Sequence, residues 1–316
     1  MADAALVADI GGTNLRAALV DREGKILSRR ATRTDVKSGG TRMLDRLMAV
    51  LKETAADSGG SFAGIGLAVA SPTDPSTGTL YNPPNLPDWD GFSPMEALTR
   101  EYPGARIIIG NDANLAALAV HHFGQGRGLR NVIYMTVSTG IGGGIIINGE
   151  MYEGSRGFAG EFGHIVVLPN GPKCPCGRTG CLEALASGTA VARSAQKRII
   201  AGEPSTLAGK GPASRIDAVA VAAAAEAGDA LAKQVIDEAA YYLGIGISVV
   251  INSFDPDIVV IGGGMSNSLD LLRTGIMEQV KRHAIADSAH PVPIVKSDLG
   301  DDIGLLGAAA KVFGEL

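Results

Sequence analysis

The chain has 316 residues with 28 basic and 33 acidic side chains, a net charge of −5 without long charge runs. This balance excludes the basic footprint of a nucleic-acid-binding protein. Hydrophobic residues make up 46% of the chain, enough for a large core, and the length suits two domains. The N-terminus lacks the basic region of a secretory signal and the apolar runs are interrupted, so we expect a soluble cytoplasmic protein that binds neither nucleic acid nor membrane.

Strands and helices alternate along the first part of the chain. From the hydrophobic spacing we expect, in chain order, a strand at 6–10, a turn at 11–14, a strand at 15–20, a helix at 41–57, a strand at 64–70, a strand at 106–109 and a helix through about residue 122. Residues 71–94 are rich in Pro, Asn, Asp and Gly and form a long loop. Loops of that length inside a compact domain are usually functional.

The second part repeats the pattern of the first. We expect a strand at 132–137, a turn at 138–144, a returning strand at 145–147, helices over 187–200 and most of 215–252, a surface loop at 202–214, a strand at 258–261, and helices at 268–283 and 303–315. The hairpin at 9–20 recurs near 134–148 in pattern and turn chemistry. The repeat predicts two related halves, each a sheet with helices, joined near 115–135.

The segment 9–14 (DIGGTN) is suited to hold phosphates. Gly11 and Gly12 let backbone N–H groups approach an anion with no Cβ in the way. Thr13 adds a hydroxyl donor, and Asp9 is placed to hold a magnesium ion through water. Such a turn taken alone is more often only a turn, so a phosphate-binding role needs a second observation.

A second turn of the same kind provides that observation. Residues 138–144 (STGIGGG) again place a threonine, Thr139, among glycines at the matching position of the second half. Gly262-Gly263-Gly264 follows another strand and either admits the flat face of a base or only ends the strand. The pattern GxxxxGK[ST] is absent from the chain, which excludes a P-loop enzyme.

Asp112 lies in the segment GNDAN (110–114), where an expected strand ends and a helix begins. A helix N-terminus favours a carboxylate, so one interpretation makes Asp112 the N-cap of that helix. The other makes it a general base that takes a proton from a hydroxyl as the hydroxyl attacks a phosphoryl group. The residues alone leave both interpretations open.

The three cysteines of the chain, Cys174, Cys176 and Cys181, lie within eight positions, and His164 precedes the first by ten residues. Three thiolates at this spacing need a fourth ligand for tetrahedral zinc, and His164 is the nearest histidine. The alternative is a set of reduced structural cysteines. A zinc ion held by four protein ligands is structural, because no position remains for a substrate.

Two acidic residues flank this expected metal loop, Glu161 before it and Glu183 just after the last cysteine. Each is alternatively a solvated surface residue. A zinc site would fix both in space, and carboxylates are good acceptors for paired sugar hydroxyls. His164 would use one ring nitrogen for zinc and offer the other to a substrate hydroxyl.

Together these segments closely resemble the ROK family (repressor, open reading frame, kinase), which has the actin-like ATPase fold. The resemblance covers nearly the whole chain and rests on six segments in this order: DIGGTNLR at 9–16, GNDANLAA at 110–117, STGIGGG at 138–144, GEFGH at 160–164, CPCGRTGCLE at 174–183 and VIGGGMS at 260–266. Their order and spacing are most similar to the bacterial and archaeal glucokinase branch. The implied fold class is α/β, a two-lobed actin-like (ribonuclease H-like) fold with a zinc-binding loop.

The resemblance implies a role for each segment. Asp112 would be the catalytic base, and the sugar would be bound by a group of polar residues: Asn85, Asn111, Asp112, Glu161, His164 and Glu183. The nucleotide and its phosphates would be held by Asp9, Gly11, Gly12, Thr13, Asn14, Thr139, Gly140, Gly262 and Gly263. The zinc ligands would be His164, Cys174, Cys176 and Cys181. ATP with Mg²⁺ and a structural Zn²⁺ are therefore the expected cofactors.

Departures from the family's pattern are small. Asn14 stands where many members carry lysine, and Ser138 where many carry glycine. Val120-His121-His122 follows the expected catalytic helix where an acidic residue near position 120 is usual, and the sequence explains neither histidine. Repressor members carry a helix-turn-helix before the first phosphate loop. Here that loop begins at residue 9, so we expect a kinase, with a non-catalytic sugar-sensing regulator as the remote alternative.

We therefore expect a small lobe of residues 1–118, joined by a C-terminal helix at 303–316, and a large lobe of residues 119–302 with the zinc loop and nucleotide-binding residues. The expected reaction is ATP-dependent phosphorylation of a hexose at the 6-hydroxyl, with glucose as the first choice. N-acetylhexosamine kinase and fructokinase are the alternatives, because these relatives share the motifs and differ in loop shape near 70–90 and 150–160. Family members are commonly dimers or tetramers, which favours a homodimer or homotetramer.

Overall fold

The structure is a computed structural model that describes residues 4–209, 211–285 and 291–314. By their contacts the residues form two compact units. The first unit comprises Met1–Tyr134, Gly144–Gly160 and Asp298–Leu316, and the second comprises Met135–Gly143 and Glu161–Ser297. The C-terminal helix belongs to the first unit. That unit also contains residues 119–134 and the segment Gly144–Gly160.

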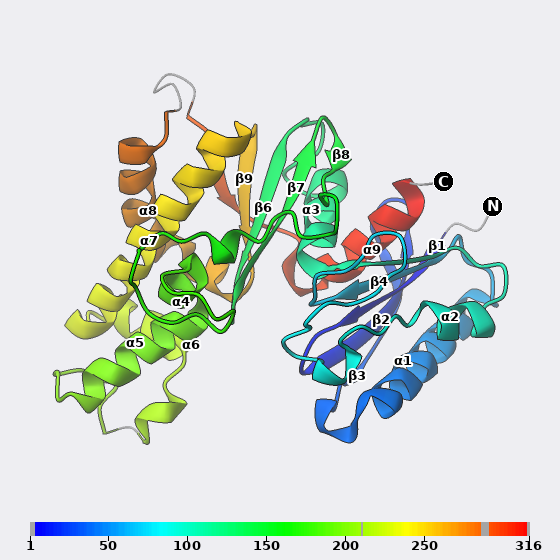
Figure 1. The fold of residues 1–316 in the computed structure, drawn as a ribbon, viewed down its shortest axis with the longest axis horizontal. Helices are drawn as coiled ribbons and strands as arrows, with labels where there is room; N and C mark the ends of the chain where they lie inside the picture. Colours follow the sequence, from blue (N-terminus) through cyan, green and yellow to red (C-terminus); the bar gives the residue numbers. More distant parts are fainter. Residues whose placement is uncertain (1–3, 210, 286–290, 315–316) are drawn as a thin grey trace. The chain divides into compact units, whose positions relative to one another are not determined.

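Two five-stranded sheets form the framework (Figure 1). The strands of the first are β1 (Ala4–Ile10), β2 (Asn14–Asp21), β3 (Ile26–Arg33), β4 (Ile65–Val69) and β5 (Ile107–Asn111), and those of the second are β6 (Val132–Val137), β7 (Ile141–Ile147), β8 (Glu150–Met151), β9 (Ile258–Gly262) and β10 (Ile294–Lys296). Their orders are β3-β2-β1-β4-β5 and β8-β7-β6-β9-β10. The two orders correspond strand for strand, which confirms the predicted pair of related halves.

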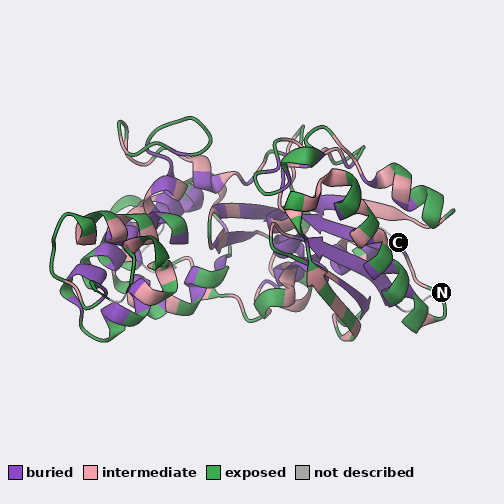
Figure 2. Cartoon of the chain, turned by 90° about the horizontal axis from the view of Figure 1, so that it is seen from below, coloured by how far each residue is buried: buried purple, intermediate pink, exposed green. Residues whose placement is uncertain are grey.

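Strand β1 is buried along its whole length because helices pack on the first sheet from both sides, and the central strands of this sheet are coloured as buried in Figure 2. The helices of this unit are α1 (Gly40–Ala55), α2 (Met95–Glu101), α3 (Asp112–Phe123) and α9 (Ile303–Gly314). Helix α1 packs on one face and α9 on the other. Strands β1, β4 and β5 are parallel neighbours, so their carboxyl ends meet at one edge of the sheet, where Asn111 ends β5.

Helix α3 is held tightly against α9. A Cβ added to Gly307 of α9 would lie 1.9 Å from the carbonyl oxygen of Leu115 in α3, a distance that no side chain tolerates. Glycine at position 307 therefore lets the two helix backbones touch. This contact fixes the helix that begins at Asp112.

The second unit is mainly helical around its sheet. Its helices are α4 (Leu182–Ala186), α5 (Gly188–Ile200), α6 (Ala218–Glu226), α7 (Ala230–Phe254) and α8 (Leu269–His283). Among the helices that the structure describes, α7 is long and apolar enough to cross a membrane, but 61% of its most apolar window is buried. It packs against α4, α5, α6 and α8, as the core helix of a globular domain does.

The structure corrects several expected elements. Strands β3, β8 and β10 and helix α2 were not expected, and β7 begins at Ile141, inside the expected turn. Residues 215–252 are mostly helical, as expected, in two helices that are separated where Gly228 adopts a φ of 91° and Asp229 caps α7. Short 3-10 helices complete the list: Val36–Ser38, Ala56–Ser58, Pro87–Trp89, Phe162–His164, Ala213–Arg215, Gly264–Ser268 and Gly300–Asp302.

Candidate active site

The first glycine turn is held rigidly between β1 and β2. The Gly11 N–H donates to the Asn14 carbonyl oxygen at 3.0 Å, which closes the turn. The buried Thr34 donates from Oγ1 to the Gly11 carbonyl oxygen at 2.6 Å and from its N–H to the Thr13 carbonyl oxygen at 3.0 Å. These bonds use the carbonyl oxygens of Gly11, Thr13 and Asn14. Thr13 and Asn14 are nevertheless exposed to solvent. The turn therefore presents a fixed set of donors to a ligand.

Asn85 of the long loop lies directly against this turn. A Cβ added to Gly12 would be 2.7 Å from the Cβ of Asn85, so the position requires glycine. The structure thus brings a sugar-binding candidate and a phosphate-binding candidate together within the first unit. Sequence spacing places them 73 positions apart (85 minus 12), and only the fold joins them.

Asp9 is a buried carboxylate in an ion pair. Arg16 donates from Nη2 to Asp9 Oδ2 at 2.8 Å and from Nη1 to the Asp301 carbonyl oxygen at 2.7 Å. Burial raises the pKa of Asp9, and the Arg16 charge opposes that rise. Asp9 Oδ1 accepts no hydrogen bond from the described part of the chain, which suits a carboxylate that holds a metal-bound water.

Asp112 is the first residue of α3, and its neighbour Asn111 is the N-cap. Asn111 Oδ1 accepts the N–H groups of Ala113 and Asn114 at 2.9 and 3.0 Å. The interpretation of Asp112 as the N-cap is therefore wrong, because the amide one position earlier performs that role. Asp112 Oδ1 accepts the Ala113 N–H at 2.8 Å. The carboxylate is thus steadied at a helix N-terminus, where negative charge is favoured.

A residue that sequence reasoning missed also orients Asn111. The Ser71 carbonyl oxygen accepts a hydrogen bond from Asn111 Nδ2 at 3.0 Å. Ser71 lies two residues after the end of β4, at the same sheet edge as the end of β5. Its position after a buried parallel strand is the signal that would have identified it. One amide hydrogen of Asn111 is left for a substrate after these three bonds.

The long loop packs against the segment that precedes Glu161. The rings of Tyr81 and Phe158 are stacked, with centroids 5.9 Å apart and planes at 22°. A Cβ added to Gly157 would lie 2.1 Å from the Thr73 carbonyl oxygen, so the two backbones touch. The two loops expected to differ between sugar specificities therefore form one surface in the first unit.

In the second unit, Glu183 is attached to the second glycine turn. Its Oε2 accepts the Ile141 N–H at 2.9 Å, from the first turn of α4. A Cβ added to Gly140 would lie 2.4 Å from that same oxygen, so glycine is required there. The Ser138 carbonyl oxygen accepts the N–H of Gly188, at the start of α5, at 2.7 Å. Turn 138–140, which contains Thr139, is thus held by residues on two helices.

The glycines after β9 lie against the same turn. Gly263 has a φ of 78°, a left-handed conformation that favours glycine. A Cβ at this position would also lie 2.6 Å from the Val137 carbonyl oxygen. Gly262 ends β9. The structure therefore brings two nucleotide-binding candidates, the turn after β6 and the turn after β9, together in one unit.

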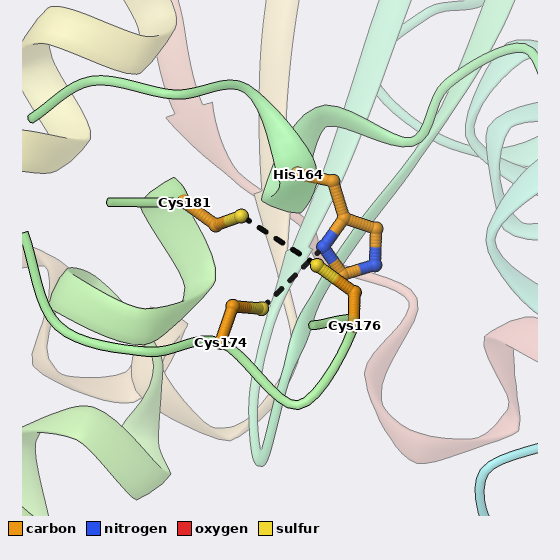
Figure 3. A group of neighbouring side chains, drawn as sticks. All are labelled: His164, Cys174, Cys176 and Cys181. Carbon is orange, nitrogen blue, oxygen red and sulfur yellow. Dashed lines mark hydrogen bonds between the residues drawn. The ribbon is translucent and has the colours of Figure 1, made fainter. Parts of the chain in front are cut away.

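His164 and the three cysteines form a cluster whose ligand atoms all lie within 4.8 Å of one another (Figure 3). The Cys176 and Cys181 sulfurs are 3.7 Å apart, and Cys174 Sγ is 3.7 Å from His164 Nδ1. Sulfurs about 3.8 Å apart are what a tetrahedron with Zn–S bonds of about 2.3 Å requires. The cysteines are reduced, so their sulfurs are free to bind a metal ion. The cluster fits zinc.

His164 joins this cluster to Glu161. Its Nδ1 faces the cysteines, while its Nε2 is 3.7 Å from Glu161 Oε2. Burial raises the pKa of Glu161; His164 opposes the rise and the nearby Glu183 adds to it. Cys174 Sγ also lies 3.9 Å from Glu183 Oε1. Both expected sugar carboxylates are therefore within the reach of the metal cluster, and neither is a free surface residue.

The two histidines that the sequence left unexplained have a structural role. His121 Nε2 lies 3.0 Å from the Leu129 carbonyl oxygen, and His122 Nδ1 lies 3.1 Å from the Leu118 carbonyl oxygen. Their rings meet edge to face at 5.2 Å. His121 ties the end of α3 to the segment that follows it, whereas His122 bonds back to a residue within α3.

Comparison with known proteins matches the ROK family over residues 6–314. A glucokinase of Halalkalibacterium halodurans is 35% identical over 95% of this chain and 92% of its own length. The solved ROK hexokinase of Thermus thermophilus is 34% identical, with a TM-score of 0.84 over 99% of this chain and 98% of its own. A ROK glucokinase of Streptomyces griseus, solved with glucose and AMPPNP, is 33% identical, with a TM-score of 0.82 over 97% and 98%.

Relatives with other activities are nearly as similar. An N-acetylmannosamine kinase of Shigella boydii is 33% identical over 98% of both chains. A solved ROK family transcriptional regulator is 27% identical, with a TM-score of 0.85 over 98% of this chain and 78% of its own. Sequence and fold similarity therefore leave the choice of sugar open.

Proposed function

The chain belongs to the ROK family and is a hexose kinase, and we propose that it transfers the γ-phosphoryl group of ATP to the 6-hydroxyl of glucose with Asp112 as the general base. One observation supports this role of Asp112 above the others. Asn111 takes over the capping of α3, so the Asp112 carboxylate is left at a helix N-terminus beside an oriented amide. A general base requires such a fixed position.

In this proposal the sugar hydroxyls are bound by amide, carboxylate and imidazole side chains. The proposed ligands are Asn85, Asn111, Glu161, His164 and Glu183. The cluster that fits zinc supports the last three, because it fixes the backbone between Glu161 and Glu183. The zinc is structural, since His164 and three cysteines complete its coordination.

The donor phosphates are held by the two glycine turns. The N–H groups and hydroxyls near Thr13 and Thr139 balance the phosphate charge, and Gly262 with Gly263 borders the adenosine. Asp9 would hold magnesium through water, and the ion would help to balance the phosphate charge. Asp112 takes the proton of the 6-hydroxyl as that oxygen attacks the γ-phosphorus, and ADP leaves.

Glucose is favoured over N-acetylated sugars by the chemistry of the candidates. Every proposed ligand is a polar group suited to bind a hydroxyl. A sugar that lacks one of these hydroxyls leaves a polar group of the site without a hydrogen bond and therefore binds more weakly. The stack of Tyr81 on Phe158 closes the two loops against each other, which supports a site of fixed shape. We also propose a cytoplasmic homodimer or homotetramer, as in the expectation from the sequence.

An assay of coupled ADP release tests the proposal. Values of kcat/KM are compared for glucose, mannose, fructose, N-acetylglucosamine and N-acetylmannosamine. We expect the highest value for glucose and a lower value for mannose. A higher value for fructose or an acetylated sugar would overturn the choice of glucose and leave the kinase assignment in place.

A further inference from the structure

One segment of this acidic chain is strongly basic. Residues 29–46 contain six basic and two acidic side chains, a local charge of +4 (6 minus 2) in a chain of net charge −5: Arg29, Arg30, Arg33, Lys37, Arg42 and Arg46 against Asp35 and Asp45. The segment runs from the edge strand β3 through the 3-10 helix to α1. It therefore adjoins the first glycine turn, to which Thr34 is bonded.

Half of these basic residues have an acidic partner. Arg29 pairs with Asp302 at 2.9 Å, Arg30 pairs with Asp57, and Arg46 pairs with Asp35 at 2.9 Å. The other three, Arg33, Lys37 and Arg42, have no acidic partner within 4.0 Å in the part of the chain that the structure describes.

Two of the three unpaired residues line a cavity that opens beside the glycine turn. The cavity measures about 420 Å³, and its walls are Gly12, Thr13, Arg33, Asp35, Val36, Lys37 and Arg46. This volume is within the range of about 300–1,000 Å³ that is typical of ligand pockets. Three cationic side chains and one acid give the wall a charge of +2, and the whole cavity belongs to the first unit.

The arrangement favours an anion in the cavity. Like charges that surround a concave space repel one another and attract a ligand of opposite sign. Arg33 supplies a planar fork of donors that matches a phosphate, and Lys37 supplies a compact charge. The buried Thr34 follows Arg33 and bonds to both Gly11 and Thr13, so the basic wall and the glycine turn form one rigid piece.

We propose that this cavity is an anion site for phosphoryl groups, in which Arg33 and Lys37 bind phosphate oxygens next to the turn at Gly12 and Thr13. This proposal rests on the proposed function, because both sources of the phosphate take part in the proposed reaction. One source is the phosphate chain of the donor, and the other is the phosphorylated sugar. The shared chemistry is a phosphate chain or monoester.

Calorimetric titration with inorganic tripolyphosphate tests the site without turnover. The variant Arg33→Gln/Lys37→Gln removes two charges from the wall, and the control Lys25→Gln/Arg42→Gln removes two from exposed residues that do not line the cavity. We expect the wild type and the control to bind within about twofold of each other, and the cavity variant to bind at least about tenfold more weakly. All four side chains lie outside the core, so the variants remain folded.

The same variants separate the two sources of phosphate. A raised KM for ATP with unchanged kcat in the cavity variant assigns the site to the donor. A raised inhibition constant for glucose 6-phosphate alone assigns it to the product. Absence of tripolyphosphate binding by the wild type, or equal binding by all three proteins, would overturn the anion site. Binding that depends on Arg33 and Lys37 in a protein that phosphorylates no sugar would retain the site and refute the proposed function.

Discussion

Replacement of Asp112 by asparagine should lower the reaction rate strongly and the stability of the fold only slightly. Asparagine keeps an oxygen that can accept the Ala113 N–H, so α3 retains this bond. What is lost is one negative charge in the first turn of the helix, a change of about 0.3–1 kcal/mol in the free energy of unfolding. We therefore expect the melting temperature of Asp112→Asn to fall by a few degrees at most.

The effect on the rate is much larger. An amide cannot take the proton of the attacking hydroxyl, and loss of a general base lowers the rate by about 10²–10⁴, which is about 3–5 kcal/mol in the activation barrier. Glucose binding should change little, since Asn85, Asn111 and the carboxylates of the second unit are untouched. Coupled ADP release provides kcat, and calorimetric titration with glucose provides Kd.

A matched control is available at another helix N-terminus. Asp217 caps α6 and accepts the Ala220 N–H at 2.8 Å, so Asp217→Asn makes the same chemical change outside the proposed site. It should leave kcat within about twofold of wild type. Turnover of Asp112→Asn within about threefold of wild type, or a rate loss matched by Asp217→Asn, would refute the assignment of the base.

Three further predictions concern the metal, the loops and the pH dependence of stability. Cys176→Ser should lower the zinc content from about one per chain and reduce both the melting temperature and the activity, because the metal loses a ligand. Cys176 is exposed, so the substitution opens no cavity in the core and the loss of stability would come from the metal site. Phe158→Ala should raise KM for glucose by about tenfold, with a smaller change in kcat, as the loop surface loosens. Burial raises the pKa of Asp229, but its hydrogen bonds outweigh burial and lower the pKa to about 2. Asp229→Asn should therefore lose about 2 kcal/mol of stability at pH 7, a loss that disappears as the pH falls from about 4 to 2.

Each of these has its own check. Full activity and unchanged melting of metal-free protein would contradict the structural role of zinc. Tyr152 is an exposed aromatic residue of the same segment with no ring partner among the described residues, so Tyr152→Ala should leave KM unchanged. An equal rise of KM in both aromatic variants would show that the stack has no special role. The stability difference for Asp229→Asn should shrink toward low pH in denaturant titrations, and a constant difference would exclude the charge as its cause.

Sequence reasoning predicted the residue clusters that are local along the chain and missed contacts that depend on the fold. The turn at 11–14, the start of α3 and the cysteine loop were predictable, because glycine, capping residues and ligand spacing act over a few positions. Strand β3 was missed although its residues alternate between half-buried and exposed. Its polar outer positions, typical of an edge strand, weaken the hydrophobic signal.

Long-range packing explains why the sequence alone could not decide whether Asp112 caps α3. From the sequence, Asn111 and Asp112 are both good N-caps. The Ser71 carbonyl oxygen, 40 positions away (111 minus 71), accepts from the Asn111 amide and so orients its oxygen toward α3. No local pattern contains that partner, since it arises from the parallel pairing of β4 with β5.

Glu183 shows how one side chain connects three parts of the second unit. Its Oε2 accepts the Ile141 N–H beside the turn at 138–140, its Oε1 lies near the Cys174 sulfur, and its charge acts on Glu161. A zinc ion on the cysteines would fix the start of α4, and therefore the place of this carboxylate. Because a Cβ at position 140 would lie 2.4 Å from Oε2, glycine at this position lets the carboxylate approach the turn at 138–140. A metal ion in this cluster would thus set the positions of Glu161, Glu183 and the turn at 138–140 together, the residues that we propose to bind sugar and phosphate.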